Sequence, residues 1–426
     1  MRSVLICCTP VHGHVAPLLS VARHLLAAGH RVRFLTGARY RDAVLAAGVD
    51  HLPLPSGADY DDTDFDRDFP GRAGLDGVAK MRHDMREIFI RPVPQQIAAV
   101  DAALAAEHTD AVLAESVFFG AAAIAARPRA TRPLVVNLGI VPVSLTSRHA
   151  APFGLGIPPL AGAAGRLRNM LLNVVARRVV FGPVQRYADR VYAGAARGFV
   201  MDWPATTDAI VQFTVPGFEY PRPDRDHLLR FVGPVSRSEA TDRPLPEWWD
   251  DLSGPRPVVH VTQGTIANLD YGALIRPTIE GLAGDDVLVV VSTGGRDAST
   301  LAGPLPANVR VASYLPYDRL LPMTDVMVTN GGYGGVHFAL QYGVPLVVAG
   351  TTEDKIEVSA RVAWAGVGVN LKTDNPTSAA VAGAVHTVLA DPDYRKASAA
   401  IGAEIASAPG LDGLIDVIES ATALER

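Results

Sequence analysis

The sequence predicts an α/β protein of two domains, each a parallel sheet covered by helices, and three observations support this prediction. Short apolar runs alternate with helical segments in both halves of the chain, which is typical of βαβ units. A proline-rich stretch without apolar periodicity separates the two alternating regions. The length of 426 residues suits two domains of roughly 200 residues each. We therefore expect two Rossmann-like domains that face each other across a cleft.

In the first half, strands and helices alternate from the first residues onward. The apolar run SVLICCT predicts a buried strand, and the longer segment that begins HVAPLLS predicts the helix after it. Strands are expected at 3–9, 31–37, 110–116 and 133–139, and helices at 14–30, 41–48 and 120–126. The acidic stretch DYDDTDFDRDF, residues 59–69, has no apolar period. A solvated loop and a mobile lid are the two interpretations of it.

The second half repeats the alternation after the proline-rich stretch. Strands are expected at 258–264, 287–295, 309–316, 325–332 and 344–350, with a helix at 274–284 and a last helix at 411–424. We divide the chain into a first domain (1–215), an interdomain connection (216–256), a second domain (257–408) and a C-terminal helix (409–426).

The composition argues against several classes of protein. The net charge is −5 and there is no basic tail or Lys/Arg cluster, so nucleic acid is not an expected partner. No segment approaches about 18 uninterrupted apolar residues, so we expect no membrane span. Cys7 and Cys8 are adjacent in one predicted strand and face opposite sides, which predicts two reduced core thiols. Because the N-terminus shows no signal-peptide pattern, we expect a cytoplasmic protein.

Two turns follow predicted strands and open predicted helices. The stretch TNGGYGG, residues 329–335, places four glycines within five positions, which indicates backbone that comes close to a ligand. A phosphate group at a helix N-terminus is the physical candidate. The turn TPVHGHVAP, residues 9–17, lacks the GxGxxG pattern of dinucleotide-binding proteins and carries His12, Gly13 and His14 instead.

His14 is the candidate general base of the TPVHGHVAP turn. We expect the helix N-terminus to lower the pKa of a nearby imidazole and to keep it neutral. Two other interpretations of His12 and His14 stay open. One is a surface or capping role, and the other is a zinc site, for which no third ligand stands at metal spacing.

Taken together, motifs at both ends of the chain resemble those of the nucleotide-sugar-dependent glycosyltransferases of the GT-B fold. Besides the TPVHGH opening, these are VTQGT, VASYLPYDRLLPMTDVMVTNGGYGGVHFALQYGVP, TTEDK and RVAWAGVGVNL. The bacterial natural-product branch related to the UDP-glycosyltransferases is the closer match. The resemblance implies the GT-B architecture, with an acceptor-binding first domain and a donor-binding second domain.

The resemblance also implies roles for single residues. His14 matches the general base that deprotonates the acceptor hydroxyl. Glu115 falls where the family usually has an Asp that orients this histidine, and an ordinary strand-end carboxylate is its other interpretation. The positions that match the donor site are Thr265 near the phosphates, Tyr314 stacked on the base, Tyr317 at the base edge, Gly331, Gly332, Gly334 and Gly335 at the diphosphate, and Glu353, Asp354 and Lys355 at the sugar hydroxyls.

The chain departs from the family pattern at several of these positions. Asn330 replaces a histidine that touches the phosphate, and Gly335 replaces Ser or Thr. Lys355 replaces Gln and either reaches a sugar oxygen or pairs with Glu357. Phe338 replaces the Glu that binds the ribose hydroxyls, and a buried unpaired hydroxyl costs about 1–3 kcal/mol. This favours a dTDP-sugar donor, whose deoxyribose lacks the 2′-hydroxyl; a core position for Phe338 and a UDP-sugar donor are the alternative.

The acceptor site is less well defined by the sequence. Phe118, Phe119 and Phe153, together with Met170, are candidates to line an apolar acceptor pocket, and each is equally a candidate for the core. The run RLRNMLLNVVARRVV, residues 166–180, mixes Arg with apolar residues at helical spacing. We favour a packed amphipathic helix for it over contact with a membrane surface.

These observations predict an inverting, metal-independent glycosyltransferase of the hexosyltransferase type. Its substrates would be a nucleoside diphosphate sugar and a small hydrophobic aglycone of secondary metabolism, such as an antibiotic precursor. We expect no cofactor, and a monomer or homodimer. The alternative is a catalytically silent paralogue that binds a partner or a glycoside, because Asn330, Gly335 and Phe338 lose polar groups. A nucleotide-sugar epimerase on the same scaffold fits the TPVHGH opening poorly.

Overall fold

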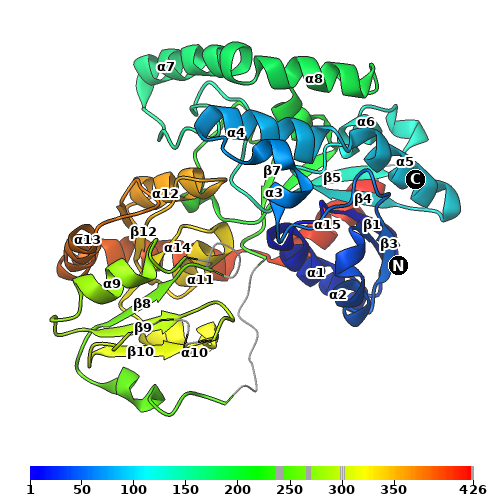
Figure 1. The fold of residues 1–426 in the computed structure, drawn as a ribbon. Helices are drawn as coiled ribbons and strands as arrows, with labels where there is room; N and C mark the ends of the chain where they lie inside the picture. The colour runs from blue at the N-terminus through cyan, green and yellow to red at the C-terminus, as the bar shows by residue number, and fades with distance from the viewer. Residues whose placement is uncertain (236–243, 265–269, 298, 300, 302, 424–426) are drawn as a thin grey trace.

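The computed structural model consists of two parallel sheets with helices on their faces (Figure 1). It describes residues 1–235, 244–264, 270–297, 299, 301 and 303–423. Within them the first sheet has the order β3-β2-β1-β4-β5-β6-β7, and the second has the order β10-β9-β8-β11-β12-β13. Neighbouring strands pair in parallel throughout both sheets. The predicted α/β class and the pair of Rossmann-like sheets are confirmed.

The strands of the first sheet are short, and the strongly apolar ones are those that the sequence predicts. The sheet comprises β1 (Ser3–Cys7), β2 (Arg31–Thr36), β3 (Asp50–Pro53), β4 (Ala111–Glu115), β5 (Leu134–Gly139), β6 (Ala209–Gln212) and β7 (Leu229–Phe231). The strands β3, β6 and β7 were not foreseen; each is three or four residues long and lies towards an edge of the sheet. Since β7 belongs to this sheet, the sheet extends into the stretch predicted as a connection.

The second sheet follows the predicted strands closely. It comprises β8 (Val258–Thr262), β9 (Leu288–Ser292), β10 (Val309–Ala312), β11 (Val326–Thr329), β12 (Leu346–Val348) and β13 (Gly368–Asn370). Only β13 at the sheet edge was missed, again a three-residue strand. The central strands are valine-rich and fully buried, as expected where helices cover both faces of a parallel sheet.

Helices connect the strands and cover both sheets. Those of the first half are α1 (His12–Ala27), α2 (Arg41–Ala46), α3 (Phe65–Asp68), α4 (Gly77–Asp84), α5 (Val93–Ala106), α6 (Ala121–Ala125), α7 (Gly162–Val175) and α8 (Gly182–Tyr192). Those of the second half are α9 (Ile275–Gly281), α10 (Tyr317–Leu320), α11 (Tyr333–Gln341), α12 (Lys355–Trp364), α13 (Ser378–Ala390), α14 (Pro392–Ser407) and α15 (Leu411–Ala423). Two π-helical segments, η3 (Met85–Ile90) and η5 (Ala176–Val180), extend α4 and α7.

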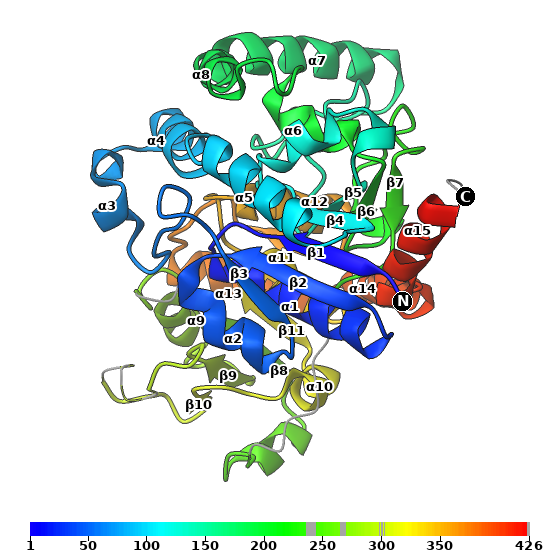
Figure 2. The same ribbon diagram turned by 90° about the vertical axis from the view of Figure 1, so that its right-hand side faces the viewer.

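The last helix returns to the first domain. Leu414 and Ile418 of α15 are fully buried in the core that also contains residues of α1, β1 and β5. Figure 2 shows α15 beside the first sheet, close to the N-terminus. Cys7 and Cys8 are buried and free, as predicted; they project into separate core clusters on opposite faces of the sheet.

Candidate active site

At the carboxyl edge of the first sheet, the turn after β1 meets the end of β4, because these strands are parallel neighbours. From β1 the chain adds strands towards one edge of the sheet, and from β4 it adds them towards the other edge. Open α/β sheets bind ligands in the crevice at such a reversal point. His14 lies in the first turn of α1, just after β1, and Glu115 is the last residue of β4. The topology therefore brings together two residues that are far apart in the sequence.

The His14 ring and the Glu115 carboxylate form a close pair. Nδ1 of His14 lies 3.2 Å from Oε2 of Glu115, although the ring is not aligned for a regular hydrogen bond in this conformation. The Glu115 side chain is buried and accepts further hydrogen bonds from the Thr9 hydroxyl at 2.6 Å and from the backbone N–H of Val117 at 2.7 Å. Glu115 is therefore fixed against the imidazole and is not a solvated strand-end carboxylate.

Both groups of this pair have shifted pKa values. Burial raises the pKa of the Glu115 carboxyl, but the His14 charge and the hydrogen bonds to the carboxylate outweigh it, so the pKa lies below its usual range. Burial lowers the pKa of His14, but the Glu115 charge, helped by Asp354 and Glu353, outweighs it and leaves that pKa raised. The expectation that the helix N-terminus would lower the pKa of His14 is wrong, because the adjacent carboxylate stabilises the imidazolium more strongly.

The acidic stretch 59–69 supports the start of α1. Asp62 is buried, and its Oδ2 accepts a hydrogen bond of 2.7 Å from the backbone N–H of His12. Its Oδ1 accepts from the Tyr40 hydroxyl at 2.7 Å and from Arg39. At Asp62 the interpretation as a solvated loop is therefore wrong. A carboxylate at a helix N-terminus is electrostatically favourable, and here it anchors the turn that carries His14.

The second sheet repeats this arrangement at β8 and β11, its own reversal point. The residues Asn330, Gly331 and Gly332 join β11 to α11, and Gly334 and Gly335 lie in the first helical turn. Gly331 has φ +81, and a Cβ there would lie 2.7 Å from Oγ of Ser359, so only glycine suits the position. No side chain of the described residues caps α11, so its first N–H groups are available to a ligand at the helix N-terminus.

Asn330 and Thr265 are two further positions that were predicted to lie in the donor site. Asn330 donates a hydrogen bond of 2.6 Å from Nδ2 to the backbone carbonyl of Gln263, which ties the end of β11 to the end of β8. Its amide therefore has a structural role in addition to the predicted contact with phosphate. Thr265 lies outside the described residues.

The aromatic residues at the far end of the crevice are only partly placed as predicted. Tyr314 is 50% exposed and its hydroxyl lies against Gly295; its stacking on the base stays a prediction. The Tyr317 hydroxyl points into the domain and lies 3.3 Å from Nε2 of the buried His260. The hydroxyl is therefore engaged inside the domain in this conformation, and the placement of Tyr317 at the base edge stays a prediction. Phe338 is half-buried and packs edge-on against Tyr317, with ring centroids 5.5 Å apart.

The segment Glu353–Lys355 precedes and opens α12. Glu353 has φ +56 and an exposed side chain. Lys355 forms an ion pair with Glu353, so the suggested pairing with Glu357 is wrong. Burial raises the pKa of Asp354, while the charges of Lys355 and His14 oppose this effect. Asp354 and Glu353 help to raise the pKa of His14, so the predicted sugar-binding segment is near enough to the predicted base to act on it electrostatically.

The predicted acceptor residues are mostly core residues. Phe118 and Phe119 are 0% and 1% exposed and belong to the core beneath α5 and α8, so their assignment to an acceptor pocket is wrong. A short apolar run has the same sequence pattern in a core and in the wall of a pocket, so only the packing distinguishes the two. Phe153 is half-buried and lines a cavity of about 10 Å³ together with Phe181 and Phe199. That volume is at most one water molecule.

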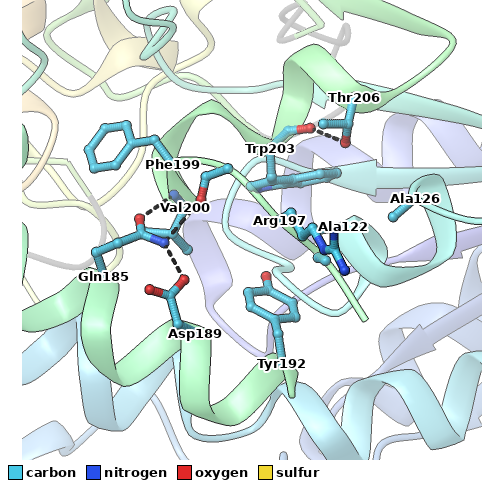
Figure 3. Close-up of a pocket in the computed structure, with 12 residues that line it drawn as sticks. Ala122, Ala126, Gln185, Asp189, Tyr192, Arg197, Phe199, Val200, Trp203 and Thr206 are labelled. Carbon is cyan, nitrogen blue, oxygen red and sulfur yellow. Dashed lines mark hydrogen bonds between the residues drawn. The ribbon is translucent and has the colours of Figure 1, made fainter. Parts of the chain in front are cut away.

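A second cavity, of about 20 Å³, lies between α6, α8 and the segment 196–206 (Figure 3). Several of its polar groups already have partners. Asp189 accepts a hydrogen bond of 2.7 Å from Gln185, and the Tyr192 hydroxyl donates one of 2.8 Å to the carbonyl of Phe119. The Trp203 ring N–H donates one of 2.8 Å to the carbonyl of Ser116. Neither cavity is large enough for an aglycone.

A buried charge cluster joins the two domains, and it was not predicted from the sequence. Arg361 of α12 is 0% exposed and donates from Nε to Oε1 of Glu219, at 3.0 Å, and from Nη1 to Oε2 of Glu357, at 2.8 Å. Arg222 donates to the same Glu219 oxygen at 3.0 Å. Oε1 of Glu357 accepts from the backbone N–H groups of residues 154–156 at 2.8–3.1 Å. The i, i+4 spacing of Glu357 and Arg361 was a usable signal, whereas Glu219 offered none.

Comparison with known protein families gives two matches along the chain. Residues 11–137 match the glycosyltransferase family 28 N-terminal domain. Residues 277–420 match the domain described as erythromycin biosynthesis protein CIII-like, C-terminal domain. Among the described residues, no group of three or more His, Cys, Asp or Glu side chains is placed to hold a metal ion.

Individual proteins are similar over nearly the whole chain. The 4'-demethylrebeccamycin synthase of Lentzea aerocolonigenes is 41% identical over 98% of this chain and 98% of its own length. UDP-glycosyltransferase 2 of Phaeomoniella chlamydospora is 34% identical over 99% of this chain and 96% of its own. The crystal structure of the spinosyn rhamnosyltransferase SpnG with thymidine diphosphate has the same fold, with a TM-score of 0.67, 16% identity, and coverage of 98% of this chain and all of that one.

Proposed function

Because this chain belongs to the nucleotide-sugar-dependent glycosyltransferases of the GT-B fold, in the natural-product branch related to the UDP-glycosyltransferases, we propose that it is an inverting, metal-independent enzyme. The proposed donor is a dTDP-sugar, with a UDP-sugar as the alternative, and the proposed acceptor is a small hydrophobic aglycone. The observation that carries the proposal is the fixed His14–Glu115 pair, which faces Asp354 and Glu353 of the donor domain.

In the proposed reaction, His14 accepts the proton of the acceptor hydroxyl. The ionised Glu115 holds the ring in place and stabilises the imidazolium that forms, since it raises the pKa of His14. A positioned base of this kind typically contributes about 10²–10⁴ in rate. The acceptor oxygen attacks the anomeric carbon on the face opposite the leaving diphosphate, which inverts that centre.

The negative charge of the leaving diphosphate would be stabilised at the second sheet. The uncapped N–H groups of the first turn of α11, together with the backbone of Gly331 and Gly332, lie at the reversal point of this sheet. A helix N-terminus carries partial positive charge and aligned donors. This arrangement supplies the charge stabilisation without a metal ion. Asp354 is the proposed partner of the sugar hydroxyls, on the opposite side of the cleft from Glu115.

Titration calorimetry with nucleoside diphosphates tests the donor proposal. We expect dTDP to bind roughly 5–150-fold more tightly than UDP, because an unpaired ribose hydroxyl beside Phe338 costs about 1–3 kcal/mol. The nucleotide dUDP should resemble dTDP, which separates the hydroxyl from the methyl group of thymine. Phe338→Glu should bring UDP close to dTDP in affinity, whereas Phe338→Leu should keep the preference. Equal or tighter binding of UDP to the native protein would refute the dTDP preference.

The pH profile tests the role of Glu115. In Glu115→Gln we expect the acid limb of the kcat/KM profile to move to lower pH, with a lower maximum. The reason is that Glu115 raises the pKa of His14; without its charge this pKa falls, so the ring stays neutral at lower pH but is a weaker base. Rates measured between about pH 5 and 8 would show the shift. The control is Glu107→Gln, which changes a partly exposed carboxylate paired with Arg31 at the surface. An unmoved limb in Glu115→Gln contradicts the assignment.

A further inference from the structure

Helix α7 and the segment η5 expose apolar side chains to solvent. More than half of the exposed large apolar side chains of the described residues fall between Leu155 and Val179. The α7 face consists of six of them, which are 49–61% exposed: Leu167, Met170, Leu171, Val174, Val175 and Val179. In Figure 1, α7 lies along the outer edge of the first domain, away from the second sheet. A contiguous apolar surface of this kind marks an interaction site.

The polarity of α7 is reversed relative to an ordinary surface helix. Its inward stripe contains Gly165, Asn169 and Asn173. Nδ2 of Asn173 donates hydrogen bonds to the backbone carbonyls of Ser147 at 3.0 Å and Ala150 at 3.1 Å. Rolling the helix to bury its leucines would break these bonds and leave buried polar groups unpaired. The prediction of a packed amphipathic helix is therefore wrong: the helix forms, but its apolar side is the exposed one.

The segment that carries the α7 face is basic. Residues 162–180, which form α7 and η5, contain Arg166, Arg168, Arg177 and Arg178 and no Asp or Glu, although the whole chain carries a net charge of −5. Arg166 and Arg178, near the two ends of the face, are exposed. Neither forms an ion pair or hydrogen bond with the part of the chain that the structure describes. This mixture of Arg and apolar residues was visible in the sequence of residues 166–180, but a packed helix was favoured there over contact with a membrane surface.

We propose that the α7 face docks in the plane of an anionic lipid surface. Exposed Leu, Met and Val would enter the boundary of the acyl chains, and the arginines would pair with lipid phosphates. Charge argues against a second copy of this chain as the occupant. Two α7 faces in contact would bring the arginines of one copy against those of the other, and residues 116–188 contain no carboxylate to pair with them. Docking in the plane requires no spanning helix, and no helix of the described residues has the length and apolar character for one.

Vesicle sedimentation tests this proposal without reference to the reaction. The full chain is expected to bind vesicles of phosphatidylcholine and phosphatidylglycerol several-fold more tightly than vesicles of phosphatidylcholine alone. Added salt should weaken this binding, since surface charges are screened over about 10 Å at 0.1 M. Arg166→Gln/Arg178→Gln should lower the affinity for anionic vesicles by roughly tenfold or more, at ~1 kcal/mol for each arginine.

A matched pair of variants separates the α7 face from general surface hydrophobicity. Leu167→Gln/Leu171→Gln removes two leucines of the face, which are 58% and 59% exposed, and should abolish most of the vesicle binding. Leu45→Gln/Leu305→Gln removes two leucines that are 48% and 43% exposed elsewhere, and should bind as the native chain does. Absence of binding to anionic vesicles overturns the proposal. So does a concentration-dependent dimer that Leu167→Gln/Leu171→Gln abolishes, which would assign the face to a second copy.

Discussion

Replacing His14 with Ala is expected to lower the turnover number by about 10²–10⁴-fold while the affinity for dTDP stays nearly unchanged. His14 lies at the reversal point of the first sheet and is held there by the buried carboxylate of Glu115. The proposed contacts with the diphosphate all lie on the second domain, at the start of α11. The loss should therefore appear in kcat and not in the dissociation constant of the nucleotide, which calorimetry measures separately.

His12→Ala is the matched control for this experiment. His12 opens the same helix and its side chain is exposed, while its backbone N–H, which the substitution keeps, binds Asp62. We expect its kcat to remain close to that of the native protein. If His14→Ala turned over as fast as the native enzyme, His14 would not be the base. If the native protein bound dTDP but transferred no sugar to any acceptor, the silent-paralogue hypothesis would gain support instead.

Replacing Glu219 with Gln is expected to destabilise the protein by about 3–5 kcal/mol, the usual loss when one partner is removed from a buried ion pair. Glu219 and Arg361 are almost fully buried, and Arg222 shares the same carboxylate oxygen. Removing the charge of Glu219 would leave two guanidinium groups in the interior with only Glu357 to balance them. Denaturant unfolding followed by circular dichroism would measure the change in free energy of unfolding.

The control for this prediction is Glu107→Gln. Glu107 is partly exposed; it forms an ion pair with Arg31 at the surface, and its other oxygen lies 3.9 Å from Nε of the buried Arg33. Solvent and salt screen a pair at the surface, so we expect a much smaller loss of stability than in Glu219→Gln. Equal stability of Glu219→Gln and the native protein would contradict the assignment of the cluster as a junction between the domains. A loss of stability in Glu107→Gln as large as that in Glu219→Gln would contradict it as well.

Most of the fold was predictable, because the apolar period is a local property of the chain. The strands β1, β2, β4, β5 and β8–β12 coincide with predicted runs. The strands that were missed, β3, β6, β7 and β13, are three or four residues long and lie towards the sheet edges. Their pairing depends on a neighbouring strand that is already in place, which no short window of sequence reveals.

The candidate site was predictable where a motif fixes backbone geometry. The glycines of TNGGYGG form the turn into α11, and Gly331 has the positive φ that favours glycine. Predictions for single side chains were weaker, since the direction of a side chain depends on what packs around it. Phe118 and Phe119 point into the core, and the Tyr317 hydroxyl points towards His260.

By itself the sequence determined the alternation of strands and helices, the two sheets and the positions of His14, Glu115 and the glycine-rich turn, because these follow from periodicity and from motifs of adjacent residues. Only the tertiary structure decided the raised pKa of His14, the junction of Glu219 with Arg361 and the outward face of α7. Each of these depends on burial and on charges contributed by segments far apart in the chain. The energies of burial and of charge–charge interaction depend on distances in space, and these distances are defined only once the chain has folded.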